Sequence, residues 1–137
     1  MKIADFCAKH PIQMTTTFLG IRASENRGPH NMHQWFVVLT FQGREMTQMY
    51  WTGLGHVVRR NALKTEPKIP NIVDVLACLQ SDASMSDTFE DFCAGMGYDE
   101  DSRNAYRTWE ACQDIGRKLR KLLGYTTYRE LMECEPE

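Results

Sequence analysis

The sequence lacks any long apolar run. No segment reaches the roughly 18 to 20 consecutive apolar residues that a membrane-spanning helix requires. The first residues, MKIADFCAKHPIQM, have charged and polar side chains where a signal peptide has an uninterrupted apolar core. We therefore expect a cytoplasmic protein that does not associate with a membrane.

Motifs of known enzyme chemistry are also missing. The glycines at positions 43, 53 and 55 form neither a Walker loop nor a GxGxxG turn. His56 follows two of these glycines and could act as a general base, but no motif places a nucleophile beside it. We therefore expect no enzymatic activity and no cofactor.

Cysteine and histidine spacing gives little support for a metal site. The five cysteines are odd in number, widely spaced and without a CxxC pair, which favours reduced thiols over a disulfide framework. His30 and His33 lie three residues apart in a loop, where His10 or Cys7 could complete a site. Polar loop side chains are the simpler interpretation, so we expect no bound metal.

The composition is that of an ordinary globular protein, but its charge is unevenly distributed. The 137 residues are 42% apolar and 25% charged, which fits a single domain with a real core. The net charge of −2 conceals +5 over residues 1–69 and −7 over residues 70–137. Such asymmetry between the two halves of a chain indicates a charged partner.

The first half of the chain predicts a short helix and an antiparallel sheet. Residues 3–9 have helical spacing, and Pro11 ends that helix. Three β-rich segments follow, and a glycine-containing turn at residues 42–44 joins the last two as a β-hairpin. Both faces of the middle segment are apolar, so it should be the central strand. The predicted strands are 14–22, 35–41 and 45–52.

The second half predicts about four helices packed on that sheet, which makes the fold class α+β. Apolar residues recur at helical spacing from Ile69, with Pro70 in the first turn. A last helix is expected after Gly124, capped by Thr126 or Thr127. The predicted organisation is one domain over 1–137, with the first helix and sheet in 1–56, a basic connector in 57–69 and the helical part in 70–137.

Residues 86–123 carry the strongest helical pattern, a short helix followed by a long one. Asp87 and Glu90 have capping-box spacing, Gly97 suits a left-handed C-cap, and Asp101 or Ser102 can cap the long helix. The apolar seam of the long helix, which could also serve a homodimer, comprises Tyr106, Trp109, Cys112, Ile115, Leu119 and Leu122. Its last turns carry four cations that match the helix dipole: Arg117, Lys118, Arg120 and Lys121.

Carboxylates dominate residues 69–102, which contain eight acids and no Lys or Arg. Helix caps and first-turn positions explain some of these acids. The competing interpretation is an acidic surface that docks onto a Lys/Arg-rich site and imitates a nucleic-acid backbone. The residues predicted to bind such a partner are Asp82, Asp87, Glu90, Asp91, Asp99, Glu100 and Asp101.

An alternative function rests on the basic connector. Clustered cations bind phosphates without sequence preference, and aromatic side chains on a sheet can stack on bases. Solvated loop charge and ordinary core packing are the simpler interpretations of the same residues. The candidates are Arg59, Arg60, Lys64 and Lys68, with the aromatic residues Trp35, Tyr50 and Trp51.

Four stretches of the chain resemble a group of small bacteriophage and prophage accessory proteins. They are FCAKHPIQMT, EMTQMYWTGLGH, IPNIVDVLACLQSDA and TFEDFCAGMGYDEDSRNAYRTWEACQ, within which GYDEDSRNAY is the most specific phrase. The connector at residues 57–68 matches least. The group supplies no catalytic residues that could be carried over to this chain.

This resemblance implies a phage protein that manages the bacterial host. Among small acidic phage proteins, inhibitors of host defence such as anti-CRISPR proteins are a leading class. Our first hypothesis is therefore an inhibitor that binds a bacterial CRISPR effector complex or another defence nuclease, without binding nucleic acid directly. The second hypothesis is a phage nucleic-acid-binding regulator that uses the basic connector.

Overall fold

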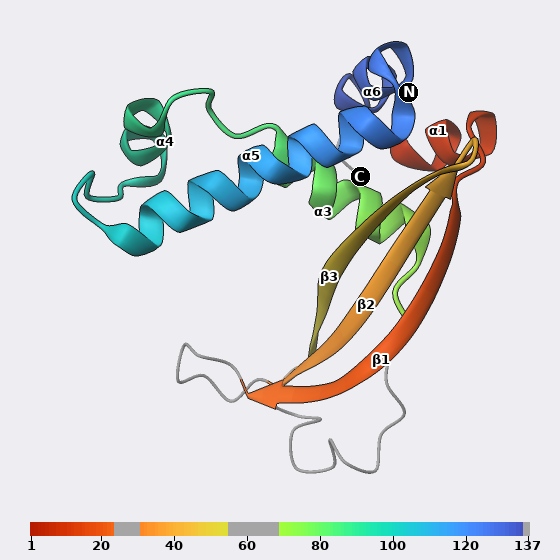
Figure 1. The fold of residues 1–137 in the computed structure, drawn as a ribbon, viewed down its shortest axis with the longest axis horizontal. Helices are drawn as coiled ribbons and strands as arrows, with labels where there is room; N and C mark the ends of the chain where they lie inside the picture. The colour runs from red at the N-terminus through yellow and green to blue at the C-terminus, as the bar shows by residue number, and fades with distance from the viewer. Residues whose placement is uncertain (24–30, 55–68, 136–137) are drawn as a thin grey trace. The chain divides into compact units, whose positions relative to one another are not determined.

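The computed structural model describes residues 1–23, 31–54 and 69–135, and its element order confirms the α+β prediction (Figure 1). A short helix precedes three strands, and the remaining helices of the described residues follow them. The chain forms two compact units. One is the sheet unit, Ile12–Ile72, and the other is the helical unit, which combines Met1–Pro11 with Val73–Glu137.

The sheet unit contains three antiparallel strands in the order β1-β2-β3, with β2 central as predicted. The strands are β1 (Gln13–Ala23), β2 (Asn31–Phe41) and β3 (Arg44–Leu54). Gln42 and Gly43 connect β2 to β3 with φ angles of 50° and 78°. Positive φ at both positions is typical of the tight hairpin turn whose twist matches that of the strands.

The two faces of β2 differ in their exposure to solvent. Trp35, Val37 and Leu39 are buried, whereas Phe36, between two of them, is 38% exposed. The alternation follows from the two-residue period of a strand. Both faces are apolar as the sequence indicated, but only one of them belongs to the core.

The helical unit joins the first helix to the last one. Helix α1 (Ile3–Lys9) lies beside α6 (Tyr125–Met132), where Lys9 Nζ and His10 Nε2 lie 3.1 Å and 2.8 Å from the Glu130 carboxylate. Ile3 and Phe6 of α1 are completely buried. The N-terminal helix therefore groups with residues more than a hundred positions away rather than with the strands that follow it.

Helix α3 (Ile72–Ala83) is tied to the end of α6. The Gln80 side-chain amide donates hydrogen bonds of 2.8 Å and 3.0 Å to the carbonyls of Leu131 and Cys134. The predicted start of α3 is wrong, because the helix begins at Ile72 and Pro70 precedes it. Proline is well suited to this place ahead of the helix, since its ring restricts the residue before it to extended conformations.

The predicted cap of α6 is also wrong. Helix α6 begins directly after Gly124, and neither Thr126 nor Thr127 caps it with a side chain. Gly124 adopts φ 77°, a conformation that glycine reaches at little cost, so the backbone reverses there without a capping side chain.

The α1–α6 contact predicts that stability depends on pH. Hydrogen bonds from His10 and Lys9 hold the pKa of Glu130 below its usual value. A carboxyl group with a lowered pKa stabilises the folded state at pH values above the pKa of the same group in the unfolded chain. This stabilisation is lost as the pH falls through the lowered pKa. We expect Glu130→Gln to unfold at lower urea concentration than the wild type at pH 6, with the difference shrinking toward pH 3.

Candidate functional site

The candidate site is a helical hairpin, which we call the acidic tip, formed by residues 86–107 of the helical unit. Helix α4 (Phe89–Met96) provides one arm, and the first turns of α5 (Arg103–Leu123) provide the other (Figure 1). Gly97 ends α4 in the predicted left-handed conformation with φ 73°. The chain then turns through residues 98–101 and enters α5.

Hydroxyl side chains cap both helices of the tip. Thr88 Oγ1 accepts a 3.2 Å hydrogen bond from the Asp91 backbone N–H, so the predicted capping role of Asp87 is wrong. Ser102 Oγ accepts a 3.2 Å hydrogen bond from the Ala105 N–H and is the cap of α5. Of the two predicted cap candidates, Asp101 is therefore left outside the helix with its carboxylate available.

Buried side chains and two long hydrogen-bonding side chains fix α4 against α5. Phe92 and Cys93 are each 2% exposed and pack with Ala105 of α5. The Trp109 Nε1–H and the Gln113 side-chain amide each donate a 2.9 Å hydrogen bond to the Ser86 carbonyl. The segment that leads into α4 is thus held to the long helix at a defined position.

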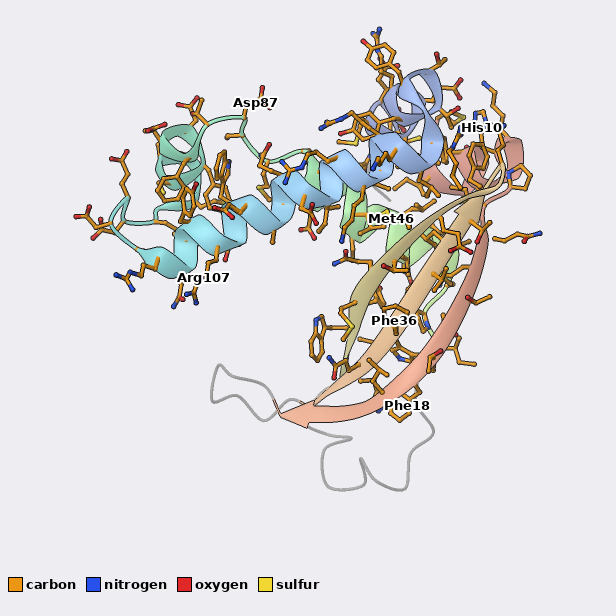
Figure 2. The ribbon with its side chains drawn as sticks, viewed as in Figure 1. His10, Phe18, Phe36, Met46, Asp87 and Arg107 are labelled. Atoms are coloured by element: carbon orange, nitrogen blue, oxygen red, sulfur yellow. The ribbon has the colours of Figure 1, made fainter. Side chains whose placement is uncertain are left out.

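Six of the seven predicted partner-binding acids lie on the acidic tip and are exposed. They lie just before α4, in its first turn and in the turn that follows it, and they are Asp87, Glu90, Asp91, Asp99, Glu100 and Asp101. Figure 2 shows Asp87 on the segment that precedes α4. Among the described residues, none of the ion pairs includes any of the six. Glu90 and Asp91 match the dipole of α4, but no described cation neutralises any of these carboxylates.

Asp82 differs from the other six acids. It is a half-buried residue near the end of α3, and burial raises the pKa of its carboxyl group. Its charge also helps to raise the pKa of the Cys112 thiol, for which burial is the larger cause. Asp82 consequently faces the interior of the helical unit, and we leave it out of the surface argued below.

Besides burial, the acids of the tip raise the pKa of the Cys93 thiol. Burial is the largest cause that raises the pKa of Cys93, and the charges of Glu100, Asp99 and Glu90 raise it further. These carboxylates come from both α4 and the following turn, so the two segments contribute to one local negative field. Asp99 Oδ1 also accepts a 3.0 Å hydrogen bond from the Asp101 N–H, which orders the turn.

Large apolar side chains are exposed among these acids. Met96, Tyr98 and Tyr106 are 47%, 44% and 45% exposed. The Tyr106 ring lies 5.1 Å from Phe89 in an edge-to-face arrangement and 5.7 Å from Trp109. Tyr106 was predicted to belong to the buried seam of α5 but is exposed. The seam is fully buried only from Cys112 to Leu122. Exposed aromatic and methionine side chains are enriched at protein interfaces.

The alternative nucleic-acid site receives no structural support. Arg59, Arg60, Lys64 and Lys68 lie outside the described residues, as do His30 and His56. The three aromatic residues do not form one platform. Trp35 is opposite Tyr50 and shares its face of the sheet, whereas Trp51 is opposite Gln34 on the other face, because successive side chains of a strand alternate.

Within the described part of the chain, no cluster of metal-binding side chains is present. No group of three His, Cys, Asp or Glu residues there could hold an ion. None of the five cysteines forms a disulfide, and the buried ones are Cys93, Cys112 and Cys134. His33 is buried, which lowers its pKa. None of the described helices combines the length and apolar character needed to cross a membrane.

Sequence reasoning missed the charged outer face of α5. Arg103 and Arg107 lie beside Phe89 and Tyr106 in a hollow of about 300 Å³, whose wall also includes Glu100. A second hollow, of about 620 Å³, is lined by the four cations in the last turns of α5, for which the sequence suggested only a favourable interaction with the helix dipole. Their spacing of three and four residues was the signal that could have identified this face.

Comparison with known proteins adds no relative: no family model, curated protein or solved structure matches the chain.

The packing of the tip predicts unequal effects of two substitutions on α4. Phe92→Ala removes a buried ring and should lower the free energy of unfolding by about 3–5 kcal/mol. Met96→Ala, on the exposed side of the same helix, should change it by less than about 0.5 kcal/mol. Urea unfolding followed by circular dichroism measures both, and equal losses would contradict the proposed core.

Proposed function

We propose that this chain is a phage-encoded, non-enzymatic inhibitor of a bacterial defence system, of the anti-CRISPR type, which acts in the cytoplasm of the host. In this proposal the acidic tip covers a cationic nucleic-acid-binding surface on an effector complex. The observation that carries the proposal is the set of six exposed carboxylates on one helical hairpin, none of which forms an ion pair with another described residue.

The composition of the tip suits a protein partner. Carboxylates alone would suit any cationic surface, but Met96, Tyr98 and Tyr106 add apolar area that a partner can desolvate. Interfaces commonly place aromatic and methionine side chains at their centre and charged groups at the rim. A nucleic-acid-binding groove is rich in Arg and Lys, which would pair with the rim of the tip.

The proposed mechanism is binding alone, without a catalysed reaction. The negative field increases the rate of encounter with a positively charged groove, and the docked tip excludes nucleic acid by occupying its place. The contacts that fix α4 against α5 lower the entropic cost of docking, because the carboxylates are presented on packed helices. Binding should therefore weaken as the salt concentration rises.

A charge-reversal experiment tests the proposal. Glu90→Lys, Asp99→Lys and Glu100→Lys together should abolish inhibition of nucleic-acid cleavage by purified, guide-loaded CRISPR effector complexes, while circular dichroism shows an unchanged fold. The matched control carries the same change in net charge at three exposed acids elsewhere, as Glu45→Lys, Glu133→Lys and Glu135→Lys. If both triple variants inhibit equally well, the acidic tip is not the docking surface.

The alternative hypothesis, a nucleic-acid-binding regulator, makes the opposite prediction for the isolated protein. A gel shift with DNA and RNA at low salt should show no complex if the protein acts by docking its acidic tip on a partner. A retarded band that disappears on substitution of Arg59, Arg60, Lys64 and Lys68 by Ala would instead favour direct binding through the basic connector.

A further inference from the structure

The outward face of α5 carries a regular row of charges. Six charged residues follow one another at intervals of four and three, which places them on a single face of a helix. In order they are Arg103, Arg107, Glu110, Asp114, Arg117 and Lys121. Figure 2 shows the Arg107 side chain on the side of α5 that points away from α4. Among the described residues, the ion pairs of this row join Asp114 to Arg117 and Lys118 within α5 itself.

The signs of the row invert about a point midway between Thr108 and Trp109. Positions equally far from that point carry opposite charges: Arg107 corresponds to Glu110, and Arg103 to Asp114. The relation continues beyond the helix. Glu100, in the turn before the helix, lines one hollow with Arg103 and Arg107 and corresponds to Arg117. A helix with this pattern is complementary to a second copy of itself that runs antiparallel.

We infer that two copies of this chain pair through the outer faces of their α5 helices, antiparallel and centred between Thr108 and Trp109. The twofold symmetry repeats each correspondence, so the three pairs 107/110, 103/114 and 100/117 give six opposite-charge contacts, while Lys121 lies opposite Met96 without a matching charge. This inference goes beyond the proposed inhibitory function and does not depend on it.

The surface of α5 is hollowed near both ends of the row. The hollow of about 300 Å³ beside the first turns is lined by residues that include Glu100, Arg103 and Arg107. The hollow of about 620 Å³ beside the last turns is lined by Asp114, Arg117, Lys118, Arg120 and Lys121. Four cations in the second hollow make it a suitable place for the Glu100 carboxylate of a second copy.

Other registers fit less well. Centring the pair on Cys112 would oppose Arg103 with Lys121, Arg107 with Arg117, and Glu110 with Asp114, which are all like charges. Centring it between Ile115 and Gly116 would match Glu110 with Lys121 and Asp114 with Arg117, but it leaves Arg103 and Arg107 without opposite charges. Within the helix this last register and the one centred between Thr108 and Trp109 each match two pairs, and the register centred between Thr108 and Trp109 is favoured because it adds Glu100 opposite Arg117.

The resulting dimer should be weak and sensitive to salt. Side chains of the row are well exposed, 62% for Arg117 and 48% for Asp114, and exposed ion pairs add little stability each. Asp114 already lies 3.6 Å and 3.2 Å from the cations of Arg117 and Lys118 in its own helix, so pairing redistributes contacts that partly exist. Dimerisation would cover Glu100 and leave Asp87, Glu90 and Asp91 accessible.

Sedimentation equilibrium of the full chain, without any partner, tests the inference. We expect a monomer–dimer equilibrium whose dissociation constant rises at least about tenfold between about 0.05 M and about 0.5 M NaCl. Arg107→Glu and Glu110→Arg should each abolish the dimer at low salt, because each places like charges opposite one another on both copies. The double variant Arg107→Glu/Glu110→Arg should restore it.

The matched control is Arg129→Glu, which reverses an exposed cation on α6 outside the row and should leave the dimer intact. Circular dichroism must show the same helix content for all variants, so that loss of association is not loss of fold. A wild-type chain that stays monomeric at low salt overturns the inference. So does a dimer that survives Arg107→Glu, which would point to the register centred between Ile115 and Gly116, or a double variant that stays monomeric.

Discussion

The helical unit depends on the packing of other elements along α5. At its N-terminal end, Phe92 and Cys93 of α4 pack with Ala105, and the Trp109 indole holds the Ser86 carbonyl. Farther along, Leu119 and Leu122 are almost completely buried. This helix of 21 residues is about 31 Å long, and helices in proteins take most of their stability from the packing of an apolar face, so this burial supports the whole length along which the charges are arranged.

The two surfaces discussed above follow from that arrangement. Capping by Thr88 and Ser102 satisfies helix N–H groups with hydroxyls, so Asp87 and Asp101 are not needed as helix caps. On α5, the charged row is exposed, and its ion pairs among the described residues lie within the helix. Charged side chains that neither cap a helix nor pack in the core can bind a partner. That partner can be a cationic surface or a second copy of the chain.

Periodicity predicted the elements of this fold well, but it did not predict which polar side chain performs a given local task. Helical spacing identified α1, α4 and α5 because each buries one apolar stripe, and an apolar β-branched and aromatic run identified β2. The cap of α4 was misassigned because Asp87 and Thr88 are adjacent and both suit an N-cap. Asp82 looked like its neighbours, since only packing reveals that its carboxyl group is partly buried.

The contact between α1 and α6 has a consequence for the order of events during synthesis. Lys9 and Glu130 are separated by 121 positions, so α1 leaves the ribosome long before its partner exists. The strands, by contrast, pair with their sequence neighbours and can form early. Until α6 is made, α1 lacks one of the helices against which it packs, so the nascent chain exposes apolar surface that is buried in the folded unit.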